Sequence, residues 1–534
     1  MHGTRIVATL GLLAFVSVTL AARMWDWVLN FDPRIGAAHT PIATGSPLTS
    51  SVTILLIDGL RLDASRGMTA LNELRARGAD IEAQVGTPSF SRPGRATIIA
   101  GAPPSVHGVT SNRQKRELTV DHLIRRVAEA GGRCRIFGSG IWPGLAGSDI
   151  AKCGESRVGE GKEGPGAFTR QVPEIRAWQK EALDFVLAEP AMLRIVDIVS
   201  TDFAAHEYGG ASSEYKAEVA RADEEVAELV RRLDLTKETL VIVADHGHRD
   251  VGGHGGDEAE VLAIPAVMAG AGVKPGVTVR GQQADIAPTI AALLGLPLPA
   301  SSSGHALEKV IQADAEKAAT VHVAIDQQRR AFEQAVRSRL EIVPDHEGWM
   351  EVVSVARERE TARRVRWALV GIASIAAFAL LLLRLERFSY LSIVAILAVA
   401  GLVTAGTSFF NQALSFSAIN YDQMLLPYFG RIMMVASCGA IVAIVVSAIA
   451  VRRGLRDTPS AAVTAGASGL TVAFGLLGAF VSWWWRFDLL MPTTLPSPGR
   501  LVEAYALLLS LFAVSATTLL VMAVVAVANR SRPA

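Results

Sequence analysis

Residues 52–58 read Val-Thr-Ile-Leu-Leu-Ile-Asp, the first of three runs that indicate the architecture of this chain. Six β-prone residues in succession, bounded by an acidic one, are typical of a strand that is buried on both faces of a sheet. Arg194–Ser200 and Thr239–Ala244 have the same form, and helical stretches such as Tyr215–Leu233 lie between the runs. This alternation predicts an α/β fold, in which a mostly parallel sheet is sandwiched by helices.

The composition separates a polar part of the chain from an apolar part. The 534 residues are 50% hydrophobic and 19% charged, with a mean hydropathy of +0.32. Soluble domains carry about 25% charged residues, so these values argue against one ordinary soluble globule. The net charge of 52 − 51 = +1 gives no basic excess, and we expect no nucleic-acid partner. Three cysteines are too few for a disulfide scaffold or a cysteine-based zinc site.

The first apolar run, Ile6–Ala22, lies near the lower length limit for a membrane-spanning helix and fits a signal anchor. A cleaved signal peptide is the alternative, because Leu20-Ala21-Ala22 offers small residues to a peptidase. The absence of a clear A-x-A site before Arg23 favours the anchor. We therefore expect an anchor at residues 1–22, a linker at 23–50 and an exported α/β domain at 51–310.

A second apolar region follows a polar, helical stalk at residues 311–365. Residues 366–528 hold five runs that are long enough, or nearly so, to cross a membrane: Trp367–Leu383, Leu391–Phe410, Ile432–Val451, Ala461–Val481 and Val502–Val527. With the anchor they predict an α-helical transmembrane bundle of six spans, with both termini on one side.

Arginines in the short loops, and in a tail at residues 529–534, place both termini in the cytoplasm. The exported domain is then periplasmic or otherwise extracytoplasmic. The arginine cluster at residues 357–366 disagrees, and we discount it because long translocated domains escape this rule.

Export also bears on the cysteines. Cys134 and Cys153 both lie in the exported domain and could pair in an oxidising compartment, or could remain two buried thiols. Cys438 lies inside an expected span and is interpreted as inert packing.

Each of the three strand runs is bounded by, or closely precedes, an acidic residue: Asp58, Asp202 and Asp245. Ligand sites in such sheets lie outside the carboxyl ends of the strands, so we expect the three carboxylates to converge there. They would repel one another unless cations compensate them. Histidines stand close by in the sequence, namely His206, His246 and His254. A mixture of carboxylates and imidazoles suits zinc or a similar transition ion, and two such ions about 4 Å apart serve phosphoryl chemistry.

Taken singly, each of these residues has an ordinary explanation. An Asp after a strand is usually a cap or turn former, and a His is usually a satisfied core or surface residue. The set as a whole favours a metal site.

A candidate nucleophile lies in residues 87–95, before the apolar stretch Ala96–Ala100. Pro93 suits the first turn of a helix, where unpaired backbone N–H groups stabilise anions. Ser91 could attack phosphorus there with its pKa lowered by a metal ion. Ser89 is the competing residue, and a simple helix cap is the alternative role for either serine. Asn112 is a further candidate for contacting phosphate oxygens.

These motifs resemble the alkaline phosphatase superfamily, in its branch of type I phosphodiesterases and GPI ethanolamine-phosphate transferases. The resemblance covers roughly residues 50–310, and it lies in Leu56–Arg61 with Asp63, Ser91–Gly94 with Ile98–Gly101, Thr201-Asp202 with His206, Asp245–Gly247, Gly253–Gly255 and Ala284–Pro297. The layout of one N-terminal span, an exported domain and a C-terminal bundle is similar as well.

The resemblance implies an alkaline-phosphatase-like fold and two divalent metal ions, zinc or else manganese. Asp202, His206 and His254 would hold one ion. Asp58, Asp245, His246 and the Ser91 oxygen would hold the other.

The chain departs from that branch at three positions. Ala205 stands where a Gly commonly precedes the His, His248 stands where a Met is common, and Arg95 replaces a common His. Ser91-x-Pro93-x-Arg95 also matches the sulfatase signature, in which the Ser is converted to formylglycine. Sulfatases, however, usually carry paired acids where this chain has Asp58-Gly59, and their calcium site is poorer in His.

The sequence thus predicts a membrane-bound phosphodiesterase or phosphoethanolamine-type transferase that acts through Ser91. Its expected partners are membrane lipids and a lipid- or glycan-linked phosphodiester, and no particular oligomeric state is indicated. A sulfatase is the first alternative. The second, of another class, is a non-catalytic transport or assembly factor with a degenerate enzyme domain.

Overall fold

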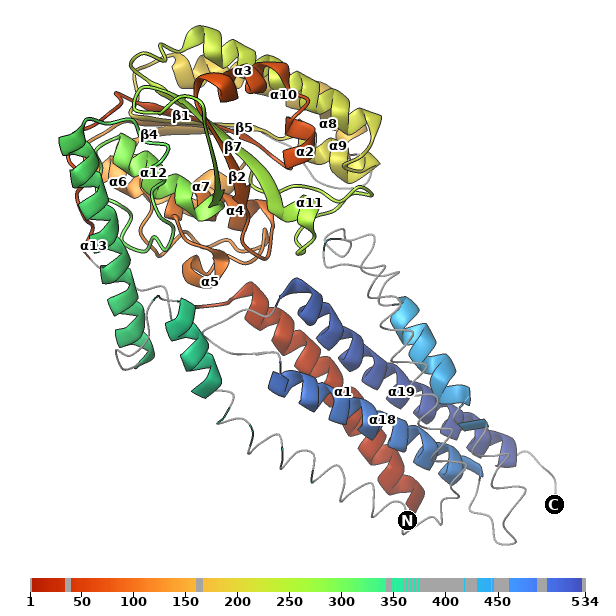
Figure 1. The fold of residues 1–534 in the computed structure, drawn as a ribbon. Helices are drawn as coiled ribbons and strands as arrows, with labels where there is room; N and C mark the ends of the chain where they lie inside the picture. Colours follow the sequence, from red (N-terminus) through yellow and green to blue (C-terminus); the bar gives the residue numbers. More distant parts are fainter. Residues whose placement is uncertain are drawn as a thin grey trace. The chain divides into compact units, whose positions relative to one another are not determined.

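Eight strands form one mixed sheet in the computed structural model of this chain, in the order β4-β3-β5-β1-β6-β7-β2-β8 (Figure 1). The strands are β1 (Val52–Ile57), β2 (Ala79–Gln84), β3 (Cys134–Gly138), β4 (Gly154–Val158), β5 (Leu193–Ile198), β6 (Thr239–Val243), β7 (Ala263–Gly270) and β8 (Val277–Gln282). All neighbours pair in parallel except β7, which is antiparallel to both β6 and β2. The prediction of a mostly parallel sheet within an α/β fold is confirmed.

The structure describes residues 2–33, 40–159, 167–341, 350–359, 430–442, 461–486 and 497–530, with a few single positions between them. These residues belong to two compact units. One holds Val28–Ala356 with Pro492–Ser497, and is called the α/β unit below. The other holds Met1–Trp27, Arg357–Met491 and Pro498–Ala534, and is called the helical unit.

The central strand β1 lies between β5 and β6 and is buried along its whole length. Its register pairs Ile57 with Ile198 of β5 and Leu56 with Val243 of β6. The carboxyl ends of these three parallel strands therefore lie at one edge of the sheet. The residues that follow them meet there, as the sequence predicts.

One boundary differs from the expectation. β5 ends at Ile198, and helix α9 (Ser200–Tyr208) begins two residues later. Asp202 consequently lies in the first turn of a helix rather than just beyond a strand end. His206 stands one turn further along the same helix face, because residues four apart are neighbours on a helix.

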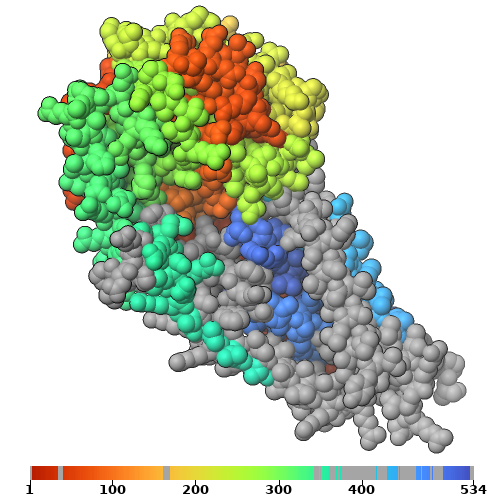
Figure 2. Space-filling model, in the orientation of Figure 1, coloured from red at the N-terminus to blue at the C-terminus, as the bar shows by residue number. Residues whose placement is uncertain are grey.

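Helices cover both faces of the sheet (Figure 1). One face carries α2 (Leu62–Ser65), α3 (Thr69–Arg77), α8 (Ala167–Leu187), α9 and α10 (Ser213–Arg232). The other carries α4 (Ser91–Ala100), α6 (Leu123–Glu129), α7 (Ile141–Cys153) and α12 (Ile286–Leu293). Short helices α5 (Pro104–His107), α11 (Ala259–Leu262) and η1 (Gln283–Asp285) complete this layer structure. The space-filling view shows the orange surface of α2 and α3 beside the yellow-green surface of α9 and α10 (Figure 2).

The region expected as a stalk contains a long helix, α13 (Ala315–Leu340). The N-terminal cap of α13 is Asp314, whose side chain accepts a hydrogen bond from the backbone N–H of Lys317. Phe332 and Val336 on this helix are buried and belong to the core of the α/β unit. Helix α13 is thus packed on the α/β unit and contributes to its core.

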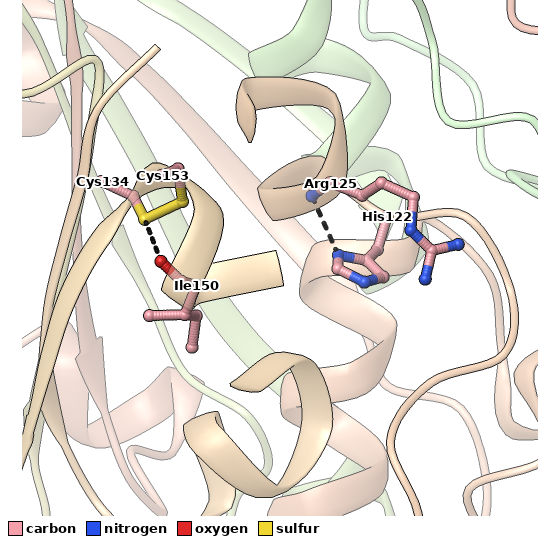
Figure 3. The surroundings of a disulfide bond; sticks show 5 residues. All are labelled: His122, Arg125, Cys134, Ile150 and Cys153. Atoms are coloured by element: carbon pink, nitrogen blue, oxygen red, sulfur yellow. Dashed lines mark hydrogen bonds between the residues drawn. A yellow bond between two sulfur atoms is a disulfide. The ribbon is translucent and has the colours of Figure 1, made fainter. Parts of the chain in front are cut away.

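A disulfide joins Cys134 at the start of β3 to Cys153 at the end of α7 (Figure 3). Of the two alternatives left open by the sequence, the structure has the paired one. The bond closes the segment that holds all of β3, α7 and the turn between them. Cys134 Sγ also lies 3.9 Å from the carbonyl oxygen of Ile150, one turn before Cys153.

The helical unit contains α1 (His2–Leu29), α18 (Ala461–Arg486) and α19 (Pro498–Arg530). Two described helices, Gly3–Leu29 and Pro498–Ala528, are long and apolar enough to cross a membrane. Gly430–Val442 and Ala465–Val481 are shorter apolar helices. The expected spans Trp367–Leu383 and Leu391–Phe410 lie outside the described residues, so the number of six spans stays a prediction.

Helices α1 and α19 run antiparallel. Tyr505, near the start of α19, lies with its hydroxyl 3.5 Å from the carbonyl oxygen of Ala21, near the end of α1. Its ring also meets Trp25 edge to face, at 6.1 Å between centroids. The first residues of α1 and the last residues of α19 therefore lie at the same end of the helical unit (Figure 1).

The disulfide is expected to stabilise the α/β unit by restricting the unfolded chain. Replacing Cys134→Ala and Cys153→Ala together should lower the free energy of unfolding by about 3 kcal/mol, given a sequence separation of 19 residues. Thermal denaturation of the detergent-purified protein would show a lower midpoint. Cys438→Ala is the matched control and should leave the midpoint unchanged. A double variant as stable as the unmodified protein would contradict this prediction.

Candidate metal centre and active site

Two of the predicted acids face each other at the carboxyl edge of the sheet. Asp58 directly follows β1, and Asp245 lies two residues after the end of β6. Asp245 is fixed by two backbone donors, the N–H groups of Gly59 at 3.2 Å and His246 at 3.1 Å, which bind its Oδ1. Burial, and then the charge of Asp58, raise the pKa of the Asp245 carboxyl well above its ordinary value. The pair needs positive charge close by.

Arg95 of α4 supplies that charge from within the protein. Its Nη1 donates to Asp245 Oδ2 at 2.5 Å and its Nη2 to Asp58 Oδ2 at 2.7 Å, and the side chain is fully buried. Burial alone would lower the pKa of this guanidinium, but the surrounding carboxylates hold it well above its ordinary value. The sequence identified Arg95 as a departure from the transferase motif and as part of a sulfatase signature, but not as a counterion. Its role as a counterion depends on contacts 150 and 37 residues away along the chain.

A third acid in this network was missed by the sequence analysis. Asp197, inside β5, is fully buried and lies 3.3 Å from Arg95 Nη2. It also accepts hydrogen bonds from the indole N–H of Trp142 and the backbone N–H of Ser139. The signal that could have revealed it is an acidic residue within an otherwise apolar strand run, because a buried charge requires partners.

Helix α4 approaches Asp245 very closely, and a glycine makes this possible. A Cβ atom on Gly94 would stand 2.5 Å from the carbonyl oxygen of Asp245. Gly59 is constrained as well, since its φ is +70° and a Cβ there would stand 2.8 Å from the ring of His248. A second acid at position 59, as in sulfatases, therefore has no room in this structure.

The remaining predicted ligands form a second group beside the first. The ligand atoms of Asp202, His246, His248 and His254 all lie within 4.8 Å of one another. The atoms of Asp58, Asp245 and His246 meet the same criterion, so His246 belongs to both groups. His206 adjoins the first group, with its Nε2 3.1 Å from His254 Nε2 and 3.5 Å from Asp202 Oδ2. The structure thus brings all six predicted acids and histidines together.

His248 is a member that the sequence analysis did not assign. Its Nε2 lies 2.7 Å from Asp202 Oδ1, the shortest contact that this carboxylate makes with the neighbouring histidines. The sequence showed only that His248 replaces a common Met. The chain turns after Asp245 and brings His248 to Asp202 of α9. Spacing along the sequence does not predict this contact.

Burial keeps these imidazoles in the neutral form that binds metal ions. It lowers the pKa of His206, His246 and His248 well below the ordinary value, with help from neighbouring histidines. Burial also lowers the pKa of His254, to about 4. Neutral imidazoles and carboxylates are the donor set that zinc prefers.

Ser91 is the first residue of α4 and lies at the junction with these groups. Its Oγ is 3.1 Å from His246 Nε2, and the side chain is buried. Ser89, the competing serine, instead donates to the carbonyl oxygen of Gly256 and accepts from the N–H of Gly255. These contacts give Ser89 a structural role and leave Ser91 as the candidate nucleophile.

Asn112 reaches the same helix terminus from the loop between α5 and α6. Its Oδ1 accepts a hydrogen bond from the backbone N–H of Arg92 at 2.8 Å. Because the Asn112 oxygen is engaged in this bond, the NH₂ group is the part of the amide that can donate to a ligand. Asp58, Ser91, Asn112 and Asp202 line a common cavity of about 690 Å³.

The residues present fit a pair of divalent cations. Asp58 Oδ1 and His248 Nδ1 are buried atoms with no hydrogen-bond partner among the described residues. Asp58 Oδ1 stands only 3.4 Å from His246 Nε2. A cation bound by Asp58 and His246 together would therefore give this carboxylate oxygen a partner. A ligand set rich in His and Asp suits zinc or manganese better than calcium.

Comparison with known families supports the same conclusion. Residues 52–126 match the family model of type I phosphodiesterase / nucleotide pyrophosphatase, and residues 166–298 match that of the metalloenzyme superfamily. Both matches lie within the α/β unit. The predicted relation to the alkaline phosphatase superfamily is confirmed, as is the general dependence on metal that it implies. The kind and number of the ions stay a prediction.

Curated relatives that this chain resembles include GPI ethanolamine phosphate transferases. The chain is 27% identical over 302 residues to the catalytic subunit of human GPI ethanolamine phosphate transferase 2, covering 53% of this chain and 30% of that protein. It is 24% identical over 350 residues to human GPI ethanolamine phosphate transferase 1, covering 55% and 36%. The chain thus spans only about a third of the length of these relatives.

Solved structures are also similar to part of this chain. Murine ectonucleotide pyrophosphatase/phosphodiesterase 5 is 12% identical, with a TM-score of 0.41 over 49% of this chain and 100% of that one. A putative sulfatase from Bacteroides thetaiotaomicron is 18% identical, with a TM-score of 0.39 over 48% and 74%.

Arg95 is expected to be essential for the stability of the α/β unit. Arg95→Met leaves three buried carboxylates without their shared counterion and should lower the free energy of unfolding by about 3–5 kcal/mol. Chemical denaturation of the purified protein measures this change. Arg280→Met removes a side chain that is 91% exposed, and it serves as the control. Equal stability of the two variants would show that Arg95 is not the required counterion.

His248 is expected to strengthen metal binding, either as a ligand or by orienting Asp202. His248→Gln should weaken the affinity for zinc about 10–100-fold. Competition with a chelator, followed by elemental analysis, measures this affinity without reference to activity. His305→Gln changes an exposed histidine and should have no effect. An unchanged zinc affinity in His248→Gln would place that residue outside the metal centre.

Proposed function

We propose that this protein is a membrane-bound phosphodiesterase or phosphoethanolamine-type transferase with Ser91 as its nucleophile. The observation that carries the proposal is the position of Ser91 Oγ, 3.1 Å from His246 Nε2 at the start of α4. His246 belongs to both groups of metal-ligating atoms, so the hydroxyl stands where the two groups meet. The relatives named above are ethanolamine phosphate transferases, which favours the same chemistry here.

Two divalent cations, zinc or manganese, are proposed for the centre. Asp202, His206 and His254 would hold one, with His248 added from its contact with Asp202. Asp58, Asp245, His246 and Ser91 would hold the other. When bound, the cations would lower the pKa of the Ser91 hydroxyl and stabilise the negative charge of the leaving oxygen.

The protein residues supply position and charge for a double displacement. Ser91 Oγ, after losing its proton to solvent, forms a bond to phosphorus while the bond to the leaving alcohol breaks. Water or an acceptor hydroxyl then attacks the phosphoserine, and the bond from phosphorus to Ser91 Oγ breaks. The amide of Asn112 would donate to the phosphate oxygens throughout, since its own oxygen is held by the N–H of Arg92.

The sulfatase alternative is less compatible with this site. Gly59 leaves no room for the second acid of that family, and the histidine-rich ligand set is unlike a calcium site. Arg95, which completes the sulfatase signature, is engaged with three carboxylates. A degenerate, non-catalytic domain is also disfavoured, because each predicted ligand lies among the others.

We further propose that the helical unit anchors the enzyme with six spans and cytoplasmic termini. The antiparallel arrangement of α1 and α19, with the start of one and the end of the other at the same end of the unit, supports an even number of spans (Figure 1). The α/β unit would then act outside the cytoplasm, where a disulfide persists, on a lipid- or glycan-linked phosphodiester.

Ser91→Ala tests the nucleophile. Turnover of bis(p-nitrophenyl) phosphate should fall at least about a thousandfold, because no other group can form the covalent intermediate. Elemental analysis of the same sample should still find close to two transition ions per chain, which separates loss of the nucleophile from loss of the centre.

Ser89→Ala is the matched control and should keep most of the turnover once its lower stability is allowed for. The mass of the intact protein is measured as well, because formylglycine at position 91 would support the sulfatase instead. Substantial turnover in Ser91→Ala would overturn the assignment.

A further inference from the structure

The last residues of α1 are bound by a loop of the α/β unit, residues 108–116. Val28, in the last turn of α1, and Phe31, just beyond its end, are buried and belong to the α/β unit themselves. The carbonyl oxygen of Val28 accepts a hydrogen bond from the hydroxyl of Thr110. The carbonyl oxygen of Phe31 accepts one from Arg116 Nη2 at 2.6 Å. Because the last carbonyls of a helix have no partner within it, the loop supplies a donor where α1 needs one.

The loop and the end of α1 also approach each other closely. Gly108 has a φ of +77°, and a Cβ atom there would stand 2.8 Å from Pro33 Cδ and 3.2 Å from the carbonyl oxygen of Phe31. Within the loop, Gln114 accepts from the backbone N–H of Thr110 at 2.5 Å and donates to the carbonyl oxygen of Gly108 at 3.0 Å. The loop is therefore bound both to itself and to the end of α1.

The same loop reaches the start of α4 through two hydrogen bonds. Asn112 Oδ1 accepts from the backbone N–H of Arg92, and the carbonyl oxygen of Arg116 accepts from Arg92 Nη2, both at 2.8 Å. Arg92 directly follows Ser91, and Asn112 lines the cavity beside that serine. A continuous set of hydrogen bonds therefore joins the end of α1 to the residue next to the proposed nucleophile.

We propose that Thr110 and Arg116 are positioning residues for the reaction, and that the end of α1 is through them a part of the active site. The inference rests on the proposed function, in which the amide of Asn112 donates to the phosphate oxygens. Such a donor must be held within about 0.5 Å of its productive position. Without the contacts to Val28 and Phe31 the loop would shift and misplace the amide. The proposed metal ligands lie outside this loop and would keep their positions.

Steady-state turnover of bis(p-nitrophenyl) phosphate by the full chain in detergent tests this proposal. Thr110→Val keeps the shape of the side chain but removes its hydroxyl, and Arg116→Met removes the donor to Phe31. Each should lower kcat/KM about tenfold, the size of one weakened hydrogen bond, while elemental analysis finds the metal content unchanged. Thr110→Ser retains a hydroxyl and should restore most of the activity.

Thr44→Val is the matched control. Thr44 is buried in the same unit, and its hydroxyl likewise donates to a carbonyl oxygen distant in sequence, that of Leu296. Neither residue is among those that line the cavity beside Ser91. This variant should retain the kcat/KM of the unmodified protein. An equal loss in Thr44→Val and Thr110→Val would show a general effect of stability and overturn the positioning role.

A double-mutant cycle with Asn112→Ala separates positioning from additive structural damage. If Thr110 and Arg116 act through the Asn112 amide, their substitution in the Asn112→Ala chain should lower kcat/KM by no more than about twofold. A further loss of about tenfold in that background would mean that the effects are independent. The proposal would then be wrong.

Hydrogen exchange measures the geometric part of the inference without reference to activity. The backbone amides of residues 108–116 should exchange at least about tenfold faster in Thr110→Val and Arg116→Met than in Thr44→Val or the unmodified protein. In an active enzyme, either unchanged exchange or unchanged kcat/KM in both variants would overturn the positioning role alone. Absence of Ser91-dependent turnover in the unmodified protein would instead overturn the proposed function, and the positioning role with it.

Discussion

One buried guanidinium determines how the centre of the α/β unit is built. Arg95 binds carboxylates that come from three neighbouring strands: Asp58 after β1, Asp197 within β5 and Asp245 after β6. Parallel pairing brings these acids to one edge of the sheet, where burial leaves them little solvent to screen their repulsion. A single cation on α4 offsets that repulsion, and Gly94 lets the helix come close enough to provide it.

The same helix connects stability with chemistry. Because Arg95 fixes α4 against the strand ends, the first residue of that helix, Ser91, is held beside His246 and below Asn112. The histidines complete the other side of the centre, kept neutral by burial and fixed through contacts with Asp202. The proposed metal ligands, the proposed nucleophile and their counterion thus form one network in which no member is positioned independently.

The electrostatic character of the site changes across a short distance. The floor, made of carboxylates and neutral imidazoles, is rich in electron pairs and suits cations. Another part of the cavity wall carries the cationic side chains of Arg92, Arg113 and Lys115.

The amino-acid sequence by itself determined the three central strands of the sheet, the acids that follow them, the three nearby histidines and the serine at the start of a helix. These are local features, because hydrophobic period, helix-start signals and motif spacing act within a few residues. Only the tertiary structure decided the partners of Arg95, the inclusion of Asp197 and His248, and the pairing of Cys134 with Cys153. The physical reason is that buried charges and thiols choose partners across the fold, and the direction of a side chain after a turn depends on packing that no local pattern encodes.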